Sequence, residues 1–254
     1  MKVVILAGGK GTRLTEETIL RPKPMVEIGG KPLLWHIMSI FSRYGFNEFV
    51  VCCGYKGYMI KEYFANYALH MSDVSIDLER NTVSLHNKKT EPWVISLVDT
   101  GEETQTGGRL KRVADKIEGG PFLFTYGDGV GDVNIRELVQ FHRDTGKLAT
   151  LTAVRPSGRF GRLGLADDLV ESFREKPTAG EGWINGGYFI MEPEVLSLIE
   201  GDSTIWERDP LEKLADQGEL AAFRHNGFWE AMDTMRDKEH LQQLWESGCA
   251  KWLG

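Results

Sequence analysis

Short apolar runs alternate along the chain with longer segments in which apolar residues recur every three or four positions. The runs KVVIL, EFVVCC and PFLFTYGDG are continuously apolar, which is typical of strands buried on both faces of a parallel sheet. Residues 32–45 have helical periodicity, with a proline suited to the first turn and a glycine at the end. This alternation predicts an α/β protein with right-handed crossovers.

Residues 70–89 depart from this pattern. Val74, Ile76 and Leu78 alternate with polar residues, and the pair RN separates them from TVSLHN, which predicts an antiparallel hairpin inserted into the α/β pattern. Strand and helix patterns then resume at WVISLVDTG, GGRLKRVADKI and LATLTAV. Beyond Val154 the pattern is less regular, with helices expected at 193–199, 206–217 and 235–247, and we expect this part to extend the same sheet.

Composition excludes several classes of protein. Apolar residues make up 41% and charged residues 26% of the 254 positions, which supports a packed core and excludes disorder. The net charge of −7, without a Lys/Arg run, argues against a nucleic-acid partner. The apolar runs are shorter than the ~18 residues that a membrane span needs. Three cysteines, two of them adjacent, suit a reducing cytoplasm, so we expect a cytoplasmic protein without a membrane partner.

The segment AGGKGTRL follows the first predicted strand. Glycines at this place let backbone N–H groups approach an anion closely, and Arg13 adds a bidentate donor. The segment is not a P-loop, because Lys10 is followed by Gly11 rather than by Ser or Thr. It is not a dinucleotide fingerprint either, because Leu14 stands where that motif needs glycine. The alternative is a tight turn that only packs a helix against a strand.

The segment RPKPM places prolines on both sides of Lys23. We expect them to disfavour helix and to hold the lysine in a rigid extended segment, as a positioned charge for a phosphate. A solvated lysine in a proline-rich loop is the alternative, and from this segment alone it is the better interpretation.

The segment GGKGTRL followed by RPKPMVEIGGKPLL resembles the opening of the sugar-1-phosphate nucleotidylyltransferases. The segments LLWHI, CCGYKGYMIKEYFANY, LHMSDV, VDTGEETQTGGRLKRV, FTYGDGV and GFWEAMDT resemble the branch of that family that transfers a cytidylyl group to glucose 1-phosphate. The resemblance runs nearly end to end, and Ala231 departs from it where that branch often has proline. It implies a nucleotide-diphospho-sugar transferase fold: a Rossmann-like, mostly parallel sheet with helices on both faces and an inserted antiparallel hairpin.

Two aspartates are candidate metal ligands. Asp128 follows an apolar strand, where a carboxylate can bind a hard cation that bridges phosphate oxygens, or can cap its own turn. Asp233 stands at the start of the last predicted helix, where N-capping is an equal alternative. The resemblance implies that the two aspartates hold Mg²⁺ together.

The resemblance also implies which residues contact the substrates. Within one domain, 1–254, it implies a nucleotide-binding core over 1–154 and a sugar-phosphate-binding extension over 155–254. The nucleotide-binding residues would be Leu6, Ala7, Gly8, Gly9, Lys10, Gly11, Thr12, Arg13, Thr104, Gly108, Arg109, Gly127 and Asp128. The sugar-phosphate-binding residues would be Lys23, Gly161, Glu175, Lys176, Asn185 and Gly186, and the catalytic residues Arg13 and Lys23.

The expected reaction converts CTP and α-D-glucose 1-phosphate to CDP-glucose and pyrophosphate. Arg13 would serve the leaving pyrophosphate, and Lys23 the α-phosphate and the sugar phosphate. The loop from Glu102 to Arg109 would read cytosine, with the Thr104 hydroxyl and the Arg109 guanidinium as donors. The family commonly self-associates, so a homo-oligomer is expected.

Three alternatives compete with this function. The first is a nucleotidylyltransferase that uses UTP or dTTP, and the second is a non-catalytic nucleotide-sugar-binding protein. The third, a dehydrogenase, is disfavoured because Cys53 and Gly54 stand where a ribose-binding acid would be expected.

Overall fold

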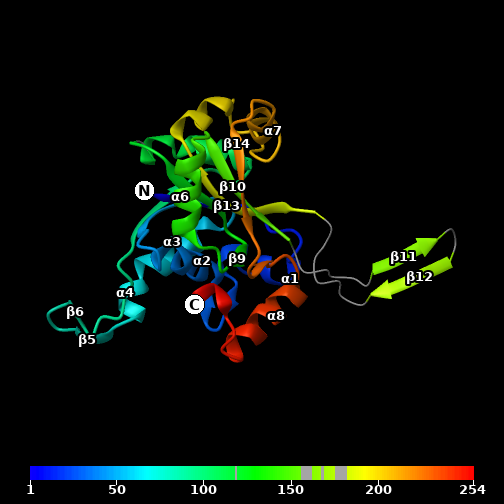
Figure 1. The fold of residues 1–254 in the computed structure, drawn as a ribbon. Helices are drawn as coiled ribbons and strands as arrows, with labels where there is room; N and C mark the ends of the chain where they lie inside the picture. Colours follow the sequence, from blue (N-terminus) through cyan, green and yellow to red (C-terminus); the bar gives the residue numbers. More distant parts are fainter. Residues whose placement is uncertain (118, 156–161, 167–168, 175–181) are drawn as a thin grey trace.

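Seven strands form one central sheet in the computed structural model, which describes residues 1–117, 119–155, 162–166, 169–174 and 182–254 (Figure 1). Across the sheet the strands are β14 (Leu220–His225), β10 (Ala149–Val154), β13 (Ile184–Met191), β8 (Phe122–Tyr126), β1 (Val3–Ala7), β4 (Glu48–Cys53) and β7 (Val94–Asp99). Every neighbouring pair is parallel except the two pairs that β13 makes with β10 and β8. The predicted α/β class and mostly parallel sheet are confirmed.

Strand β1 shows why its sequence is continuously apolar. Successive side chains of a strand point to opposite faces, and Val3, Ile5 and Ala7 belong to one buried apolar cluster while Val4 and Leu6 belong to the other. All five are buried because helices cover both faces of the sheet (Figure 1).

Each of the two apolar clusters is covered by its own set of helices. The cluster that contains Val3 is covered by α2 (Leu33–Ser42), α3 (Gly57–Ala65), α6 (Ile135–Thr145), α8 (Met235–Glu246) and the 3₁₀ helix η4 (Lys251–Leu253). The cluster that contains Val4 is covered by α5 (Thr106–Arg112), the 3₁₀ helix η3 (Pro193–Leu198) and α7 (Asp209–Asp216). The helix expected at 193–199 is the 3₁₀ helix η3. The helix expected at 206–217 is α7, which starts at Asp209 because Pro210 suits its first turn.

Helix α2 buries the apolar face that its periodicity predicts, together with one histidine. His36 Nε2 lies 2.9 Å from the Ile28 carbonyl, and Trp252 Nε1 donates to His36 Nδ1 at 3.2 Å. Burial lowers the pKa of His36 to about 4, so the ring is neutral near pH 7. The neutral ring thereby joins η4, at the end of the chain, to the core.

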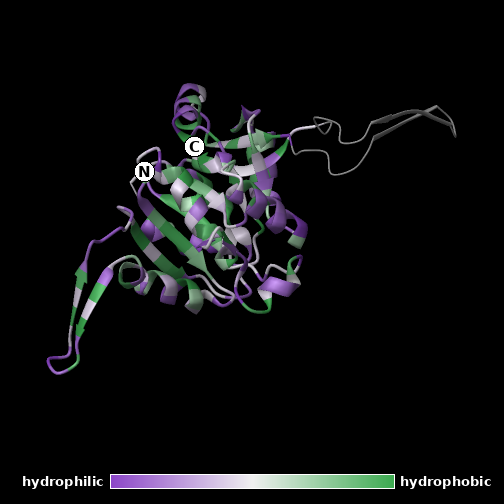
Figure 2. Cartoon of the chain, turned by 90° about the horizontal axis from the view of Figure 1, so that it is seen from below, coloured by the Kyte–Doolittle hydropathy of each residue, from purple (hydrophilic) through white to green (hydrophobic). Residues whose placement is uncertain are grey.

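The expected hairpin is present. Strands β5 (Asp73–Asp77) and β6 (Thr82–His86) pair antiparallel in a sheet of their own and project from the body of the protein (Figures 1 and 2). The short helix α4 (Tyr67–His70) precedes them. Ile76, Leu78 and Val83 are exposed on this hairpin.

The remaining elements are short. They are α1 (Thr15–Thr18), η1 (Lys23–Met25), η2 (Ala114–Lys116), β2 (Glu27–Ile28), β3 (Lys31–Pro32), β9 (Gly129–Gly131), β11 (Arg162–Ala166), β12 (Leu169–Arg174) and β15 (Trp229–Ala231). β2 pairs with β3, β11 with β12, and β9 with β15, each antiparallel. Across the described part of the chain, every helix is too short or too polar to cross a bilayer.

Candidate active site

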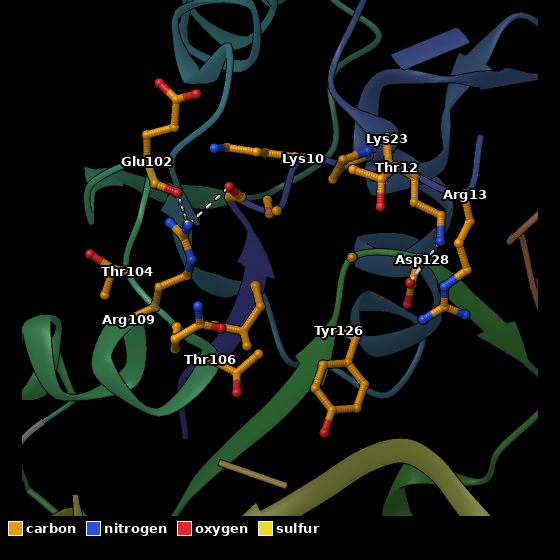
Figure 3. A pocket seen from close by; sticks show the side chains of 18 of the residues that line it. Lys10, Thr12, Arg13, Lys23, Glu102, Thr104, Thr106, Arg109, Tyr126 and Asp128 are labelled. Carbon is orange, nitrogen blue, oxygen red and sulfur yellow. Dashed lines mark hydrogen bonds and ion pairs between the residues drawn. The ribbon is translucent and has the colours of Figure 1, made fainter. Parts of the chain in front are cut away.

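A cavity of about 500 Å³ lies beyond the carboxyl ends of β1 and β8, the edge at which ligands bind in open α/β sheets. Its walls are the glycine-rich loop after β1, the loop after β7, the start of α5 and the residues that follow β8. Figure 3 shows Arg109, Thr104 and Glu102 at one end of this cavity and Arg13, Lys23 and Asp128 at the other.

The cavity brings together most of the residues expected to bind nucleotide, sugar phosphate or metal. The expected residues that line it are Leu6, Ala7, Gly8, Gly9, Lys10, Gly11, Thr12, Arg13, Lys23, Thr104, Arg109, Gly127, Asp128 and Asp233. Segments from both ends of the chain therefore meet at one place.

The glycine-rich loop is more than a tight turn. Gly11 has φ +63°, a backbone conformation that glycine adopts without strain. A side chain at Gly8 would overlap the Arg109 guanidinium, so the backbone can approach the arginine only at glycine. Leu14 is fully buried, whereas Gly9, Lys10, Thr12 and Arg13 are exposed. The loop is thus anchored at its end and presents its middle to the cavity.

Lys23 occupies the 3₁₀ turn η1, so the expected extended backbone is wrong. Pro22 and Pro24 flank the lysine, and the fixed φ of proline is compatible with the first turn of a helix as well as with extended chain. The solvated alternative is also wrong, because Lys23 is only 8% exposed. Its Nζ donates to Asp128 Oδ2 at 2.9 Å and to Asp233 Oδ1 at 2.8 Å.

The charge of Lys23 is maintained by these two carboxylates. Burial on its own lowers the pKa of Lys23, but the negative charges of Asp128 and Asp233 and their hydrogen bonds outweigh burial. The net effect raises the pKa of Lys23 above its ordinary value, so the side chain is a cation at neutral pH.

The small sheet β9–β15 places Asp233 beside Asp128. Gly129 pairs with Ala231, and Met232 N donates to the Asp128 carbonyl at 2.8 Å. The two aspartates are thereby held on neighbouring backbones although 105 positions separate them.

Helix α8 does not use Asp233 as its cap. Thr234 is the N-cap, and its side chain and that of Asp237 form a capping box. The carboxylate of Asp233 instead faces Lys23 and also accepts from Arg13 Nη1 at 2.7 Å. The capping alternative for Asp233 is therefore wrong.

Asp128 and Asp233 fit a divalent cation. Both carboxylates converge on one cationic nitrogen, and two protein carboxylates supplemented by phosphate and water oxygens are a common donor set for Mg²⁺. Among the described residues no group of three or more His, Cys, Asp or Glu side chains could hold a metal, so the other ligands would come from the substrate and water.

Arg109 lies at the opposite end of the cavity and is buried. Its Nη2 donates at 3.0 Å to the carbonyls of Gly8 and Glu102 (Figure 3). Its Nη1 donates to the Gly101 carbonyl at 2.7 Å and to the Thr100 hydroxyl at 2.9 Å. The Cys53 carbonyl lies 3.3 Å from Nη1. The guanidinium thus joins the loops that follow β1, β4 and β7.

No carboxylate in the described part of the chain forms an ion pair with Arg109. Burial lowers the pKa of Arg109, yet a guanidinium keeps its proton in proteins. Its positive charge is therefore solvated by neutral oxygens and contributes to the potential of the cavity.

The other expected contacts lie elsewhere. Asn185 and Gly186 line a smaller hollow that shares Tyr126 and Asp128 with the main cavity. Gly108 does not line the cavity; a side chain there would meet the Asp202 carbonyl at 2.5 Å, so this glycine permits close packing. Gly161, Glu175 and Lys176 lie outside the described residues.

Two polar residues at the cavity wall, Thr106 and Tyr126, and their partner Glu207 were not among the residues expected to contact the substrates. Thr106 Oγ1 donates to Glu207 Oε2 at 2.6 Å, and Asn185 Nδ2 lies 3.4 Å from the Tyr126 hydroxyl. Burial and then the charge of Glu207 raise the pKa of Tyr126, so its phenol stays protonated. Tyr126 belongs to the motif TYGDG, which was a usable signal, whereas the contact of Glu207 with Thr106 spans 101 positions and leaves no local pattern.

An open, mostly parallel α/β sheet with a glycine-rich loop, two cations and two carboxylates at its carboxyl edge defines a class of protein that binds phosphorylated ligands. The sequence profile of the nucleotidyl transferase family matches residues 2–238. The chain belongs to this family, as its motifs indicate, and membership removes the dehydrogenase alternative.

Known proteins similar to this chain match it over almost its whole length. A glucose-1-phosphate cytidylyltransferase of Salmonella typhimurium is 58% identical over 99% of this chain and 98% of its own length. A probable glucose-1-phosphate cytidylyltransferase of Bacillus subtilis is 42% identical over 99% of both. Among solved structures, HddC from Yersinia pseudotuberculosis has a TM-score of 0.70 and 25% identity, covering 96% of this chain and 99% of its own. A UDP-glucose pyrophosphorylase with bound UDP-glucose has a TM-score of 0.69 and 15% identity, covering 97% and 98%, and shares the fold.

Proposed function

We propose that the protein transfers a cytidylyl group from CTP to α-D-glucose 1-phosphate and releases pyrophosphate. The observation that carries this proposal is the convergence of Arg13, Lys23, Asp128 and Asp233 on one cavity. The choice of CTP and glucose 1-phosphate is supported by the relatives that are 58% and 42% identical.

A phosphate oxygen of the sugar phosphate attacks the α-phosphorus of CTP, and the bond from that phosphorus to the bridging oxygen of pyrophosphate breaks. The nucleophile is already anionic, so no protein group has to form a covalent intermediate. The protein has to hold two mutually repelling anions in line and to stabilise the charge that moves to the leaving group.

Lys23 and Arg13 are suited to this task. Lys23 is rigidly placed between two prolines and would hold the α-phosphate against the sugar phosphate. Arg13 has a more exposed side chain at the cavity rim and would bind the leaving pyrophosphate through its planar fork. Asp128 and Asp233 would hold Mg²⁺, which neutralises charge on phosphate oxygens when it is bound.

The opposite end of the cavity would take the base. All four Nη hydrogens of Arg109 have acceptors within the protein, so we assign contact with cytosine to Thr104 and the backbone of the loop that Arg109 holds. Asn185 and Gly186, in the adjoining hollow, would bind the sugar, and Tyr126 lies between the two sites. We accordingly propose a nucleotide-binding core over 1–154 and a sugar-phosphate-binding extension over 155–254.

We further infer a cytoplasmic homo-oligomer without nucleic-acid or membrane partners. The three cysteines are free and two of them are buried, which suits a reducing compartment. Sedimentation of the purified chain tests the oligomeric state.

A pyrophosphate-release assay with CTP, UTP, dTTP and GTP against a panel of sugar 1-phosphates tests the reaction. We expect CTP with glucose 1-phosphate to be the fastest pair. For substitutions of the cavity lysine Lys23 in the same assay, Lys147→Met is a suitable control, because Lys147 is a surface lysine that pairs with Glu219 outside the cavity. Equal or faster release from UTP or dTTP would support the first alternative, and nucleotide binding without release would support a non-catalytic binding protein.

A further inference from the structure

Lys23 is hydrogen-bonded to the carboxylate oxygen atoms that the proposed metal would need as ligands. Its ammonium bridges Asp128 Oδ2 and Asp233 Oδ1 at 2.9 and 2.8 Å, and its side chain is 11% exposed. The ammonium therefore occupies the space between the two carboxylates in the free protein.

We propose that Lys23 and the divalent cation compete for Asp128 and Asp233, so that the free protein rejects the bare cation and accepts it only together with a nucleoside triphosphate. This inference rests on the proposed function. It gives Lys23 a second role, as the residue that determines the form in which the metal binds.

The charges at the site support this competition. Among the described residues, the two positive charges of Lys23 and Arg13 are paired with the two negative charges of Asp128 and Asp233. A bare divalent cation would take the carboxylates and leave a largely buried ammonium without a partner, which is strongly unfavourable.

A triphosphate changes this balance. Its α-phosphate would offer Lys23 new anionic oxygens at the moment when the metal takes the carboxylates, so every charge keeps a partner. Arg13 can exchange in the same way, because its side chain is exposed and contacts only one of the two aspartates at 2.7 Å. Metal and nucleotide should therefore bind with positive coupling.

Equilibrium dialysis of the full chain against Mn²⁺, without nucleotide, tests the competition. We expect Lys23→Met, which keeps the aliphatic stem, to bind Mn²⁺ about tenfold or more tightly than the wild type, because charged hydrogen bonds of this kind shift equilibria by that factor. Adding Asp128→Asn to Lys23→Met should abolish the gain. Lys147→Met is the control, since Lys147 pairs with Glu219 outside the cavity, and its Mn²⁺ affinity should equal that of the wild type.

A second measurement needs no variant. Wild-type protein dialysed with Mn²⁺ and CTP, without sugar phosphate, should retain Mn²⁺ under conditions in which Mn²⁺ alone is not retained. Equal Mn²⁺ affinity of the wild type and Lys23→Met without nucleotide would overturn the competition, even if pyrophosphate release confirmed the proposed function. A gain in Lys23→Met combined with no pyrophosphate release would leave the competition standing and refute the proposed function.

Discussion

The two ends of the cavity stabilise positively charged side chains with different partners. At one end the guanidinium of Arg109 is buried and donates to neutral oxygens, four of them backbone carbonyls. At the other end Lys23 and Arg13 donate to the carboxylates of Asp128 and Asp233. Both arrangements satisfy the donors, but only the second cancels the charge.

This difference indicates a structural role for the Arg109 end of the cavity and a chemical role for the Lys23 end. A backbone carbonyl cannot move without the segment that carries it, so the contacts of Arg109 tie together the loops after β1 and β7 and the end of β4. Side-chain carboxylates can exchange an ammonium for a metal, and an ammonium can exchange a carboxylate for a phosphate. The Arg109 end is therefore suited to shape recognition, and the Lys23 end to chemistry.

The largest expected effect is on turnover at the exchangeable end. We expect Lys23→Ala and Arg13→Ala each to lower kcat by roughly 10²–10³, because each removes one preorganised donor to charge that moves in the transition state. Arg13→Ala should leave the melting temperature unchanged, since the Arg13 side chain is mostly exposed. Pyrophosphate release at saturating CTP and glucose 1-phosphate measures kcat, and a near-normal kcat in either variant would refute its assigned role.

Next in size is the loss of stability at the fixed end. Arg109→Met removes the guanidinium donor from four carbonyls. Those of Gly8 and Cys53 keep other donors, whereas those of Gly101 and Glu102, which are part-buried, lose the donor, and we expect the free energy of unfolding to fall by about 3 kcal/mol. Urea titration followed by tryptophan fluorescence measures this change. Arg112→Met is the matched control on the same helix, because Arg112 pairs with Asp202 at the surface, and it should unfold like the wild type. Equal stability of the two variants would refute a scaffold role for Arg109.

The sequence predicted the sheet better than it predicted the cavity. Continuous apolar runs such as Val3–Ala7 mark buried strands, and each of these strands has its own local signal. The contacts of Arg109 give no such local signal, because four of its five partners are backbone carbonyls, which any residue type could supply. Proline next to Lys23 suits two backbone conformations, and only tertiary packing of the carboxylates around the lysine selects between them.

A smaller effect is expected from neutralising the aspartates. Asp128→Asn and Asp233→Asn keep an oxygen ligand but lose its charge, so we expect kcat/KM to fall by about tenfold at low Mg²⁺ and to recover partly at high Mg²⁺. Titration of activity with Mg²⁺ measures the recovery, and full activity of the wild type in EDTA would contradict the metal assignment. If Asp233→Asn changed only the melting temperature, its carboxylate would have a purely structural role.

The smallest expected effect concerns the choice of base. Thr104 lines the cavity and its hydroxyl is proposed to hydrogen-bond cytosine, so Thr104→Val should lower the ratio of kcat/KM for CTP to that for UTP by about fivefold, the effect of one neutral hydrogen bond. Thr106→Val, at the start of α5, is the matched control, because the Thr106 hydroxyl already donates to Glu207 Oε2 at 2.6 Å and accepts from Trp206 N at 2.9 Å. That control should leave the CTP to UTP ratio unchanged whatever it does to stability. An unchanged ratio of kcat/KM for CTP to that for UTP in Thr104→Val would contradict the proposed hydrogen bond from the Thr104 hydroxyl. The backbone groups that Arg109 holds in place would then select the base without a side-chain contact.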